Sequence, residues 1–165
     1  MPDDYEDEPE DLDTPPPFFP YDGEDADREP VDMGEPVEVQ VEAVLAAEHA
    51  GNVQQFVLLS DGDRKLPIQI GGFEAAAITL VLEGKKTDRP MTHDLTKTLV
   101  DRLGGELVRV VIDDLWNTTY YAKLFLMHDG EEVIVDSRPS DSIALALRFD
   151  APIFVSEAIL AQADE

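Results

Sequence analysis

Residues 37–45 have the sequence VEVQVEAVL, and this stretch decides how the rest of the chain is interpreted. Valine alternates with glutamate or glutamine from Val37 to Glu42, a period of two that is typical of a strand with one buried face. The chain before this stretch is acidic and rich in proline, whereas the chain after it alternates apolar runs with turn residues. We therefore expect the folded domain to begin at Val37.

The order of elements after Val37 indicates two similar halves. Asp61-Gly62 and Asp129-Gly130 are hairpin signals, so the strands within each half are expected to pair antiparallel. The expected fold is α+β, with duplicated β3α2 units forming one mainly antiparallel, barrel-like sheet and helices packed outside it. After the opening strand, the expected strands are 55–60, 65–70, 107–113, 119–127 and 132–136, and the expected helices are 73–82, 92–103, 139–148 and 156–162.

Two of these helices have apolar residues at helical spacing. Phe73, Ala77 and Leu80 recur along the first, and the leucines at 95, 99 and 103 lie four residues apart along the second. A helix with such a spacing is expected to turn its apolar face toward the core.

The N-terminal residues 1–36 differ in composition from the rest. They contain 15 acidic residues against one base, Arg28, and 8 of the 12 prolines of the chain. Such a segment buries too little apolar surface to offset its ordering entropy, so a disordered, acidic, Pro-rich tail is predicted before the domain at 37–165. Within the tail, residues 15–21 (PPPFFPY) either belong to a solvated segment, dock on a protein partner, or form part of a self-inhibiting flap.

The bulk numbers exclude several classes of protein. The 165 residues contain no cysteine, which rules out disulfides and thiolate zinc sites. No apolar run approaches the roughly 20 residues that span a bilayer, and no signal peptide is recognisable, so a cytoplasmic protein without a membrane partner is expected. The net charge of −25 argues against a tight non-specific DNA binder but is compatible with a hydrolase that has a local site.

The first candidate site string is RPMTHDL at residues 89–95. Thr92 is expected to cap a helix, which places His93 and Asp94 in its first turn, where free N–H groups and the helix dipole favour anions. Arg89, together with Lys85 and Lys86, would attract phosphates locally. The alternative is purely structural, with Asp94 stabilising the helix start and the basic residues lying in a solvated loop.

The second candidate string is DSRPSDS at residues 136–142. Ser140 suits an N-cap, Asp136 and Asp141 are two carboxylates that could face one ion, and Arg138 could bind a phosphate through two hydrogen bonds. Glu74, which follows Gly71-Gly72, is the counterpart of these acids in the first half. Here too the alternative is a capped helix in which Arg138 pairs with a neighbouring aspartate.

Taken together, these strings resemble a known family. In chain order the sequence contains LPIQIG (66–71), EA (74–75), LEG (82–84), RPMTHDL (89–95), YYAKL (120–124), RPSDSIALA (138–146) and PIFV (152–155). Their order and spacing resemble the bifunctional nuclease (DNase/RNase) domain, over about residues 37–160. The resemblance implies a duplicated β3α2 fold and nuclease activity on DNA and RNA.

The leading hypothesis is a metal-assisted phosphodiesterase. Mg²⁺ or Mn²⁺ would be held by Glu74, Asp136 and Asp141, with Asp94 as a further carboxylate. His93 would act as general acid or base, and Arg138 would stabilise charge on the phosphate. Lys85, Lys86, Arg89, Thr92 and Ser140 are the candidate substrate contacts. The alternatives are a non-catalytic binding or regulatory module of the same fold, and a homo-oligomer in which edge strands pair across a symmetric interface.

Overall fold

The computed structural model describes residues 32–49 and 51–163, and the residues from Met33 onward form one compact unit. Most of the predicted tail, residues 1–31, lies outside the described residues. Of the rest of that segment, Met33 is half-buried against the core, and the backbone carbonyls of Met33 and Glu35 accept hydrogen bonds from Ala158 and Glu157.

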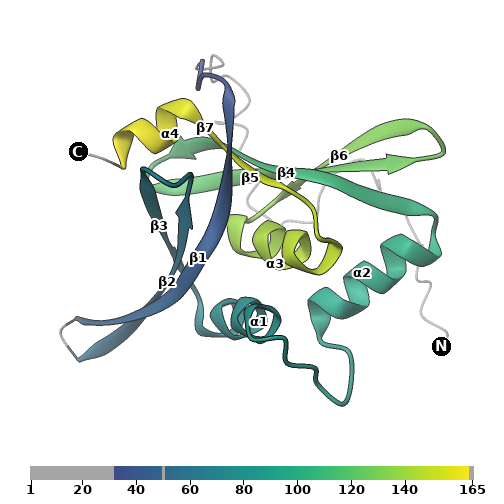
Figure 1. Ribbon diagram of the computed structural model, residues 1–165, viewed down its shortest axis with the longest axis horizontal. Helices are drawn as coiled ribbons and strands as arrows, with labels where there is room; N and C mark the ends of the chain where they lie inside the picture. Colours follow the sequence, from purple (N-terminus) through teal and green to yellow (C-terminus); the bar gives the residue numbers. More distant parts are fainter. Residues whose placement is uncertain (1–31, 50, 164–165) are drawn as a thin grey trace, which may run out of the picture. The chain divides into compact units, whose positions relative to one another are not determined.

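The described residues form one seven-stranded sheet and four helices (Figure 1). The strands are β1 (Pro36–His49), β2 (Asn52–Ser60), β3 (Lys65–Ile70), β4 (Gly105–Trp116), β5 (Thr119–His128), β6 (Glu131–Ser137) and β7 (Ile153–Ser156). The helices are α1 (Gly72–Leu82), α2 (Thr92–Arg102), α3 (Pro139–Phe149) and α4 (Glu157–Gln162). The α+β class and the mainly antiparallel sheet are confirmed, and the strands and helices expected from the sequence all form.

The strand order is β3-β2-β1-β7-β4-β5-β6, and this order corrects the predicted barrel. Strands β3 and β6 are the two edges, so the sheet is open. The halves meet at β7, a four-residue strand that the sequence analysis did not predict, which pairs antiparallel with β1 and parallel with β4. The second half therefore has the order βββαβα rather than a repeat of βββαα, and the duplication stays a prediction.

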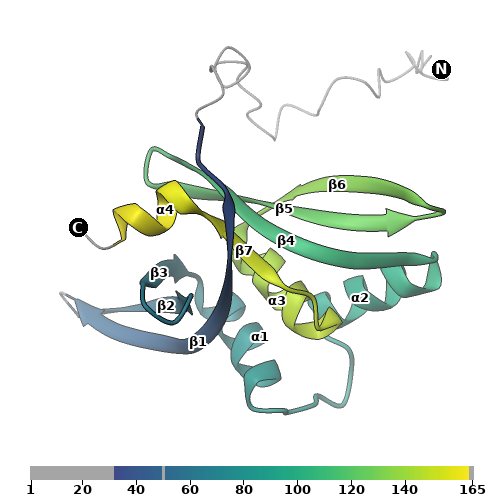
Figure 2. The same cartoon turned by 45° about the horizontal axis from the view of Figure 1, so that its top comes forward.

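The long strand β1 serves both halves because it changes partner along its length. Pro36–Val39 pairs with β7, and the register with β2 begins at Gln40 and shifts between Val41 and Ala43. A bulge of this kind bends a strand and increases its twist. The bend turns β2 and β3 away from β4, β5 and β6, and helices α1, α2 and α3 gather in the angle between the two groups of strands (Figures 1 and 2). The sheet is open and three helices lie in the angle between its two parts (Figure 1), so the expected barrel-like sheet with helices packed outside it does not form among the described residues.

Helix α3 is central to the core. Pro139, Ser140 and every residue from Ser142 to Ala146 are buried, and α3 contacts α1, α2, β4 and β5. Ile143 packs with Ile78 of α1, Ile112 of β4 and Leu59 of β2 in one apolar cluster. Each fully buried side chain of this size stabilises the fold by about 1.5–3 kcal/mol. This packing fixes the start of α3, Arg138–Ser142, against the sheet.

The predicted apolar face of α2 and the first residue of the predicted face of α1 do not point into the core. On α2, Leu95, Leu99 and Leu103 are 53%, 53% and 73% exposed, and none of its residues is fully buried. On α1, Phe73 is 92% exposed, whereas Ala77 of the same predicted face is buried. Helix α2 instead packs through the other side, where Lys97 lies over the ring of Phe149 at 4.5 Å. Spacing alone identifies an apolar stripe but does not say which side of the helix the neighbouring elements cover. No helix of the described residues is long and apolar enough to cross a bilayer.

Candidate active site

Four side chains from the starts of α1, α2 and α3 form one connected group, which we call the helix-start cluster: Glu74, His93, Arg138 and Asp141. Arg138 donates to Asp141 through Nε (2.7 Å to Oδ2) and Nη2 (3.1 Å to Oδ1). Its Nη1 lies 3.2 Å from Glu74 Oε1. On the other side, His93 Nε2 lies 3.0 Å from Asp141 Oδ1. The cluster therefore joins residues up to 67 positions apart in the chain, from Glu74 to Asp141.

The local sequence explains how the starts of α1 and α3 present these side chains. Arg138 is the N-cap of α3 and Asp141 lies in its first turn, so the two face each other three residues apart. Pro139 suits the first helical position because its missing N–H is not needed there. At α1, the N-cap is Gly71, and a side chain on Gly71 would collide with the Glu74 carboxylate. The glycine thus leaves room for Glu74 to reach over the start of its helix toward Arg138.

The ionised Asp141 carboxylate determines which ring nitrogen of His93 donates the hydrogen bond between them. Burial raises the pKa of the Asp141 carboxyl, but hydrogen bonds from Arg138 and His93 outweigh it and hold the pKa below its ordinary value. Asp141 is therefore ionised at neutral pH and only accepts hydrogen bonds. His93 Nε2 must then carry the hydrogen of its bond with Asp141, so Nδ1 is the ring nitrogen through which His93 can act as a base. An aspartate that orients a histidine in this way is a common arrangement for a general base.

Asp94, the neighbour of His93, points elsewhere. Its Oδ1 accepts from Nε of Arg148 at 2.6 Å, and its Oδ2 accepts from the backbone N–H of Met91 at 2.9 Å. Arg148 is only 6% exposed and also donates to the carbonyls of Ala77 (3.2 Å) and Ala144 (2.9 Å). Burial raises the pKa of the Asp94 carboxyl, and the hydrogen bonds from Arg148 and Met91 lower it further than burial raises it. Arg148 thereby connects α1, α2 and α3 directly beside His93.

The structure brings together some of the predicted site residues and separates others. Glu74, His93, Arg138 and Asp141 meet in the helix-start cluster, and Asp94 adjoins it through Arg148. Asp136 lies exposed on β6, where its backbone partner on β5 is Lys123. The predicted substrate contacts Lys85, Lys86, Arg89 and Thr92 are all exposed on α2 or the loop before it, and Lys85 pairs with Glu83 at 2.6 Å.

Two predicted caps are wrong by one or two residues. The N-cap of α2 is Met91 and not Thr92, because Asp94 already satisfies the backbone N–H of Met91. The N-cap of α3 is Arg138 and not Ser140, because Pro139 begins the helix and Ser140 is buried in its first turn. A serine or threonine near a helix start is a frequent cap, but proline and a first-turn aspartate compete with it for the position.

The carboxylates do not form a ready-made metal site. Within residues 32–49 and 51–163, no group of three or more His, Cys, Asp or Glu side chains is placed to hold a metal ion. Glu74 and Asp141 are instead bound to Arg138, and Asp136 is not part of the helix-start cluster. The donor set therefore does not fit a preformed divalent site, and the use of Mg²⁺ or Mn²⁺ stays a prediction.

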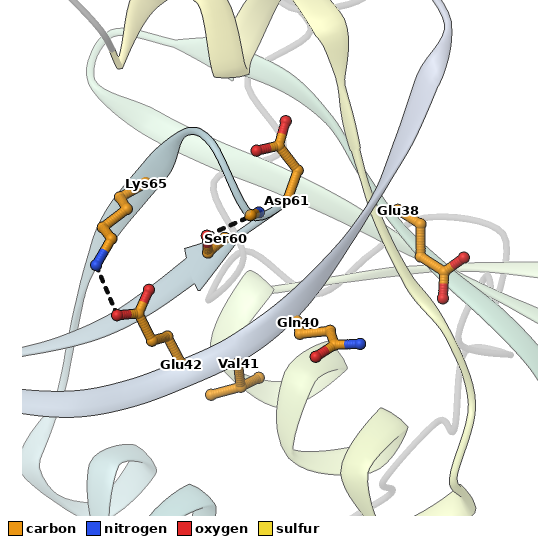
Figure 3. Close-up of a pocket in the computed structure, with 8 residues that line it drawn as sticks. Glu38, Gln40, Val41, Glu42, Ser60, Asp61 and Lys65 are labelled. Carbon is orange, nitrogen blue, oxygen red and sulfur yellow. Dashed lines mark hydrogen bonds and ion pairs between the residues drawn. The ribbon is translucent and has the colours of Figure 1, made fainter.

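Two hollows are candidates for a ligand. The first, with a volume of about 520 Å³, adjoins the helix-start cluster; we call it the Arg138 cavity. Its lining residues are Ile68, Gln69, Ile70, Gly71, Glu74, Thr118, Thr119, Tyr120, Arg138, Pro139 and Ser140. The second, of about 660 Å³, lies between β1 and the β2–β3 hairpin and contains Glu38, Glu42 and Asp61 with the single base Lys65, which pairs with Glu42 at 2.6 Å (Figure 3). Its negative charge would repel phosphates, so a nucleic-acid site is better supported at the Arg138 cavity.

Sequence reasoning missed two residues beside this site. Arg148 is one, because nothing in the sequence connects it with Asp94, 54 positions away. Phe73 is the other: it was assigned to the apolar face of α1, yet it is 92% exposed between the cavity residues Gly71 and Glu74. The sequence did contain a signal for the exposure of Phe73. An aromatic residue in the first turn, directly after two glycines, lies outside the middle of a helix, where side chains pack best.

Comparison with known proteins decides the family. Residues 57–165 match the bifunctional nuclease domain. The chain belongs to this family. The matched range contains the whole helix-start cluster and every lining residue of the Arg138 cavity, so the bifunctional nuclease domain includes the complete candidate site.

The relatives of this bifunctional nuclease domain differ in how much is known of them. An uncharacterized protein of Mycobacterium tuberculosis is 50% identical over 104 residues, which are 63% of this chain and 62% of the relative. Bifunctional nuclease 1 of Oryza sativa subsp. japonica is 30% identical over 105 residues, 61% of this chain and 32% of the relative. Bifunctional nuclease 1 of Arabidopsis thaliana is 32% identical over 95 residues, 56% of this chain and 29% of the relative. The chain thus spans under two thirds of the mycobacterial protein and about a third of the plant proteins.

Proposed function

We propose that this protein is a nuclease that hydrolyses phosphodiester bonds of DNA or RNA at the helix-start cluster. The observation that carries the proposal is the continuous contact chain Glu74–Arg138–Asp141–His93, which unites a phosphate-binding cation with an oriented histidine. Membership of the bifunctional nuclease domain family and the names of the plant relatives support the same activity.

In the proposed reaction, Arg138 binds the scissile phosphate. Its side chain is 66% exposed, and its planar guanidinium can exchange a carboxylate oxygen for a phosphate oxygen of similar geometry. The backbone N–H groups at the starts of α1, α2 and α3 add partial positive charge, which favours an anion there. This local field allows an acidic protein to bind a polyanion at one place.

His93 activates the attacking water. With Nε2 hydrogen-bonded to Asp141, Nδ1 accepts a proton as the water oxygen bonds to phosphorus. The bond between phosphorus and the leaving sugar oxygen breaks, and the leaving oxygen takes a proton from the imidazolium or from solvent. Arg138 stabilises the charge that gathers on the phosphoryl oxygens. Positioned acid–base catalysis of this kind contributes roughly 10²–10⁴-fold to a rate.

The test is turnover of single-stranded DNA and RNA by the full chain, with Mg²⁺, with Mn²⁺ and with EDTA. We expect His93→Gln and Asp141→Asn to lose at least about 100-fold in turnover. His128→Gln is the matched control, because His128 lies in the β5–β6 hairpin, half-exposed, with its ring 3.4 Å from the Gly104 carbonyl oxygen and outside the cluster. If both cluster variants turn over like the wild type while remaining folded, the proposed mechanism is wrong. Loss of activity in EDTA would establish the predicted metal dependence.

A second candidate, a non-catalytic binding or regulatory module, is favoured by one observation. Arg138 and the two carboxylates already satisfy one another, as expected for a structural link between α1 and α3. Such a module would show no turnover under any of the three metal conditions. The same experiment therefore distinguishes the two candidates.

A further inference from the structure

We propose that the Arg138 cavity binds one nucleotide unit of an unpaired strand, with Phe73 at its edge stacking on the adjacent base. The proposal rests on the proposed nuclease function for the place of the phosphate, but the binding site it describes can be tested without any turnover. Four observations carry it: the size of the cavity, its polar lining, the exposure of Phe73 and the strained turn at Thr118.

The size of the cavity suits a small unit and not a duplex. A volume of about 520 Å³ lies within the usual range of about 300–1,000 Å³ for sites that enclose small molecules. A base can enter such a site only when it has left its stack. In a duplex this step costs unpairing and unstacking, whereas an unpaired strand presents its bases freely. The cavity therefore favours single-stranded DNA or RNA.

The lining matches the three parts of a nucleotide. Arg138 is the only cation among the lining residues and supplies the phosphate contact. The Thr119 hydroxyl can donate to a sugar oxygen, and the Thr118 hydroxyl, which donates to the Asn117 carbonyl, can accept from a sugar hydroxyl. The amide of Gln69 can donate to and accept from a base edge. Tyr120 is half-buried, and burial raises the pKa of its hydroxyl further above neutral pH; a protonated tyrosine can donate a hydrogen bond. Ile70, which is partly buried, adds apolar surface for a ring.

Phe73 provides a second, adjacent contact. An aromatic side chain that is 92% exposed gains almost nothing from burial in this fold. It stands at the start of α1 between Gly71 and Glu74, both of which line the cavity. Exposed aromatic rings are the usual platforms on which proteins stack the bases of single strands. A strand whose phosphate is at Arg138 would thus pass from the cavity to this ring.

Asn117 and Thr118 are the two-residue turn between β4 and β5, which favours left-handed backbone at both positions, and threonine is strained in that conformation. Asn117 and Thr118 have φ values of 46° and 63°, in the left-handed region that glycine adopts most readily. A β-branched residue there is a genuine outlier, and such strain is concentrated at functional sites. Thr118 is exposed, so no core contact compensates for the strain; it is one of the residues that line the cavity, and its hydroxyl donates to the Asn117 carbonyl. The β5–β6 hairpin offers a comparison, because Asp129 has a φ of 50° at a turn outside the cavity.

The experiment measures equilibrium binding of a fluorescent single-stranded phosphorothioate oligonucleotide, and of the matching duplex, to the full chain in Mg²⁺. We expect the single strand to bind more tightly than the duplex, and Phe73→Ala to weaken it about tenfold or more. Leu103→Ala is the control for an exposed apolar residue, at 73% exposure, and should bind like the wild type.

Thr118→Gly separates an effect on ligand affinity from an effect on stability. Glycine relieves the left-handed strain, so the melting temperature should rise, while affinity for the single strand should fall severalfold because the hydroxyl is lost. Asp129→Gly, which relieves a similar strain outside the cavity, should leave affinity unchanged.

The two proposals fail in different ways. Single-strand binding that depends on Phe73 and Thr118, without turnover, would support the nucleotide site and overturn the nuclease function. Turnover with unchanged affinity in both variants, or a duplex bound as tightly as the single strand, would overturn the nucleotide site and leave the nuclease function standing.

Discussion

Two arginine–aspartate pairs lie on either side of His93, and they have the same chemistry in different surroundings. Arg148, bound to Asp94 by Nε at 2.6 Å, is 6% exposed, whereas Arg138, bound to Asp141 by Nε at 2.7 Å, is 66% exposed. Arg148 also donates to two backbone carbonyls of α1 and α3, while the further contact of Arg138 is a second carboxylate, Glu74. The comparison indicates that the inner pair holds the helices in place, whereas the outer pair remains accessible from solvent.

The largest expected difference concerns turnover. Arg138→Ala should reduce nuclease turnover by at least about 100-fold, because a preorganised donor to the charged phosphate is lost. The same variant should lower the free energy of unfolding by less than about 1 kcal/mol, since exposed ion pairs contribute little. Turnover assays and urea denaturation measure the two effects. Arg102→Ala, an exposed arginine of α2, serves as control. A loss of stability without loss of turnover would reverse the assignment of the two pairs.

The next effect is on stability at the inner pair. Arg148→Ala should lower the free energy of unfolding by about 3 kcal/mol, because a buried donor leaves one carboxylate and two carbonyls without their partner. Asp94 is 37% exposed, so water can solvate its carboxylate once Arg148 is removed. We therefore do not expect the largest losses of unfolding free energy that are known for broken buried ion pairs. Urea denaturation followed by circular dichroism gives the value. An unfolding free energy equal to that of Arg138→Ala would show that burial does not distinguish the pairs.

A double-mutant cycle sharpens the comparison further. The coupling free energy between Arg148 and Asp94 should be about 2 kcal/mol, and that between Arg138 and Asp141 about 0.5 kcal/mol, because solvent screens the outer pair. Each cycle uses the arginine-to-alanine and aspartate-to-asparagine variants, singly and combined, with unfolding free energies as the readout. Similar coupling in the two cycles would contradict the assignment of different roles.

The smallest effect is the dependence of stability on pH. The carboxyls of Asp94 and Asp141 have lowered pKa values in the folded protein, so the folded state favours their ionised forms. Their contribution is fully present above the unfolded pKa of about 3.9 and is lost as the pH falls through the lower folded values. Asp94→Asn and Asp141→Asn should each flatten the acid limb of a plot of unfolding free energy against pH below about pH 4. If the unfolding free energy of both variants falls below about pH 4 as steeply as that of the wild type, the two ion pairs do not favour the ionised carboxylates.

The predicted tail and homo-oligomer stay predictions, as does the cytoplasmic location. Sedimentation of the full chain would test the oligomer, and a monomer whose mass does not change with concentration would rule it out.

Local pattern by itself determined most of the elements and singled out the four residues that meet in the helix-start cluster. Alternation in 37–45, the Asp-Gly hairpins and the paired glycines are properties of neighbouring residues, and they predicted the strands, the antiparallel pairing and the helix starts that carry Glu74, His93, Arg138 and Asp141. The choice of these four residues also followed from chemistry that a short string displays, namely acids, a histidine and an arginine in first helical turns.

Only the tertiary structure decided which residues meet. Strand β7 is four residues long and its partners are β1 and β4, far away in the chain, so no local period reveals it. The same holds for Arg148 and Asp94, and for the exposure of Phe73 and of the α2 leucines, which depends on which side of a helix other elements cover. Hydrophobic periodicity is a property of one segment, whereas burial, ion pairing and sheet closure depend on surfaces that distant segments supply. That difference explains why the helix starts could be predicted while their partners could not.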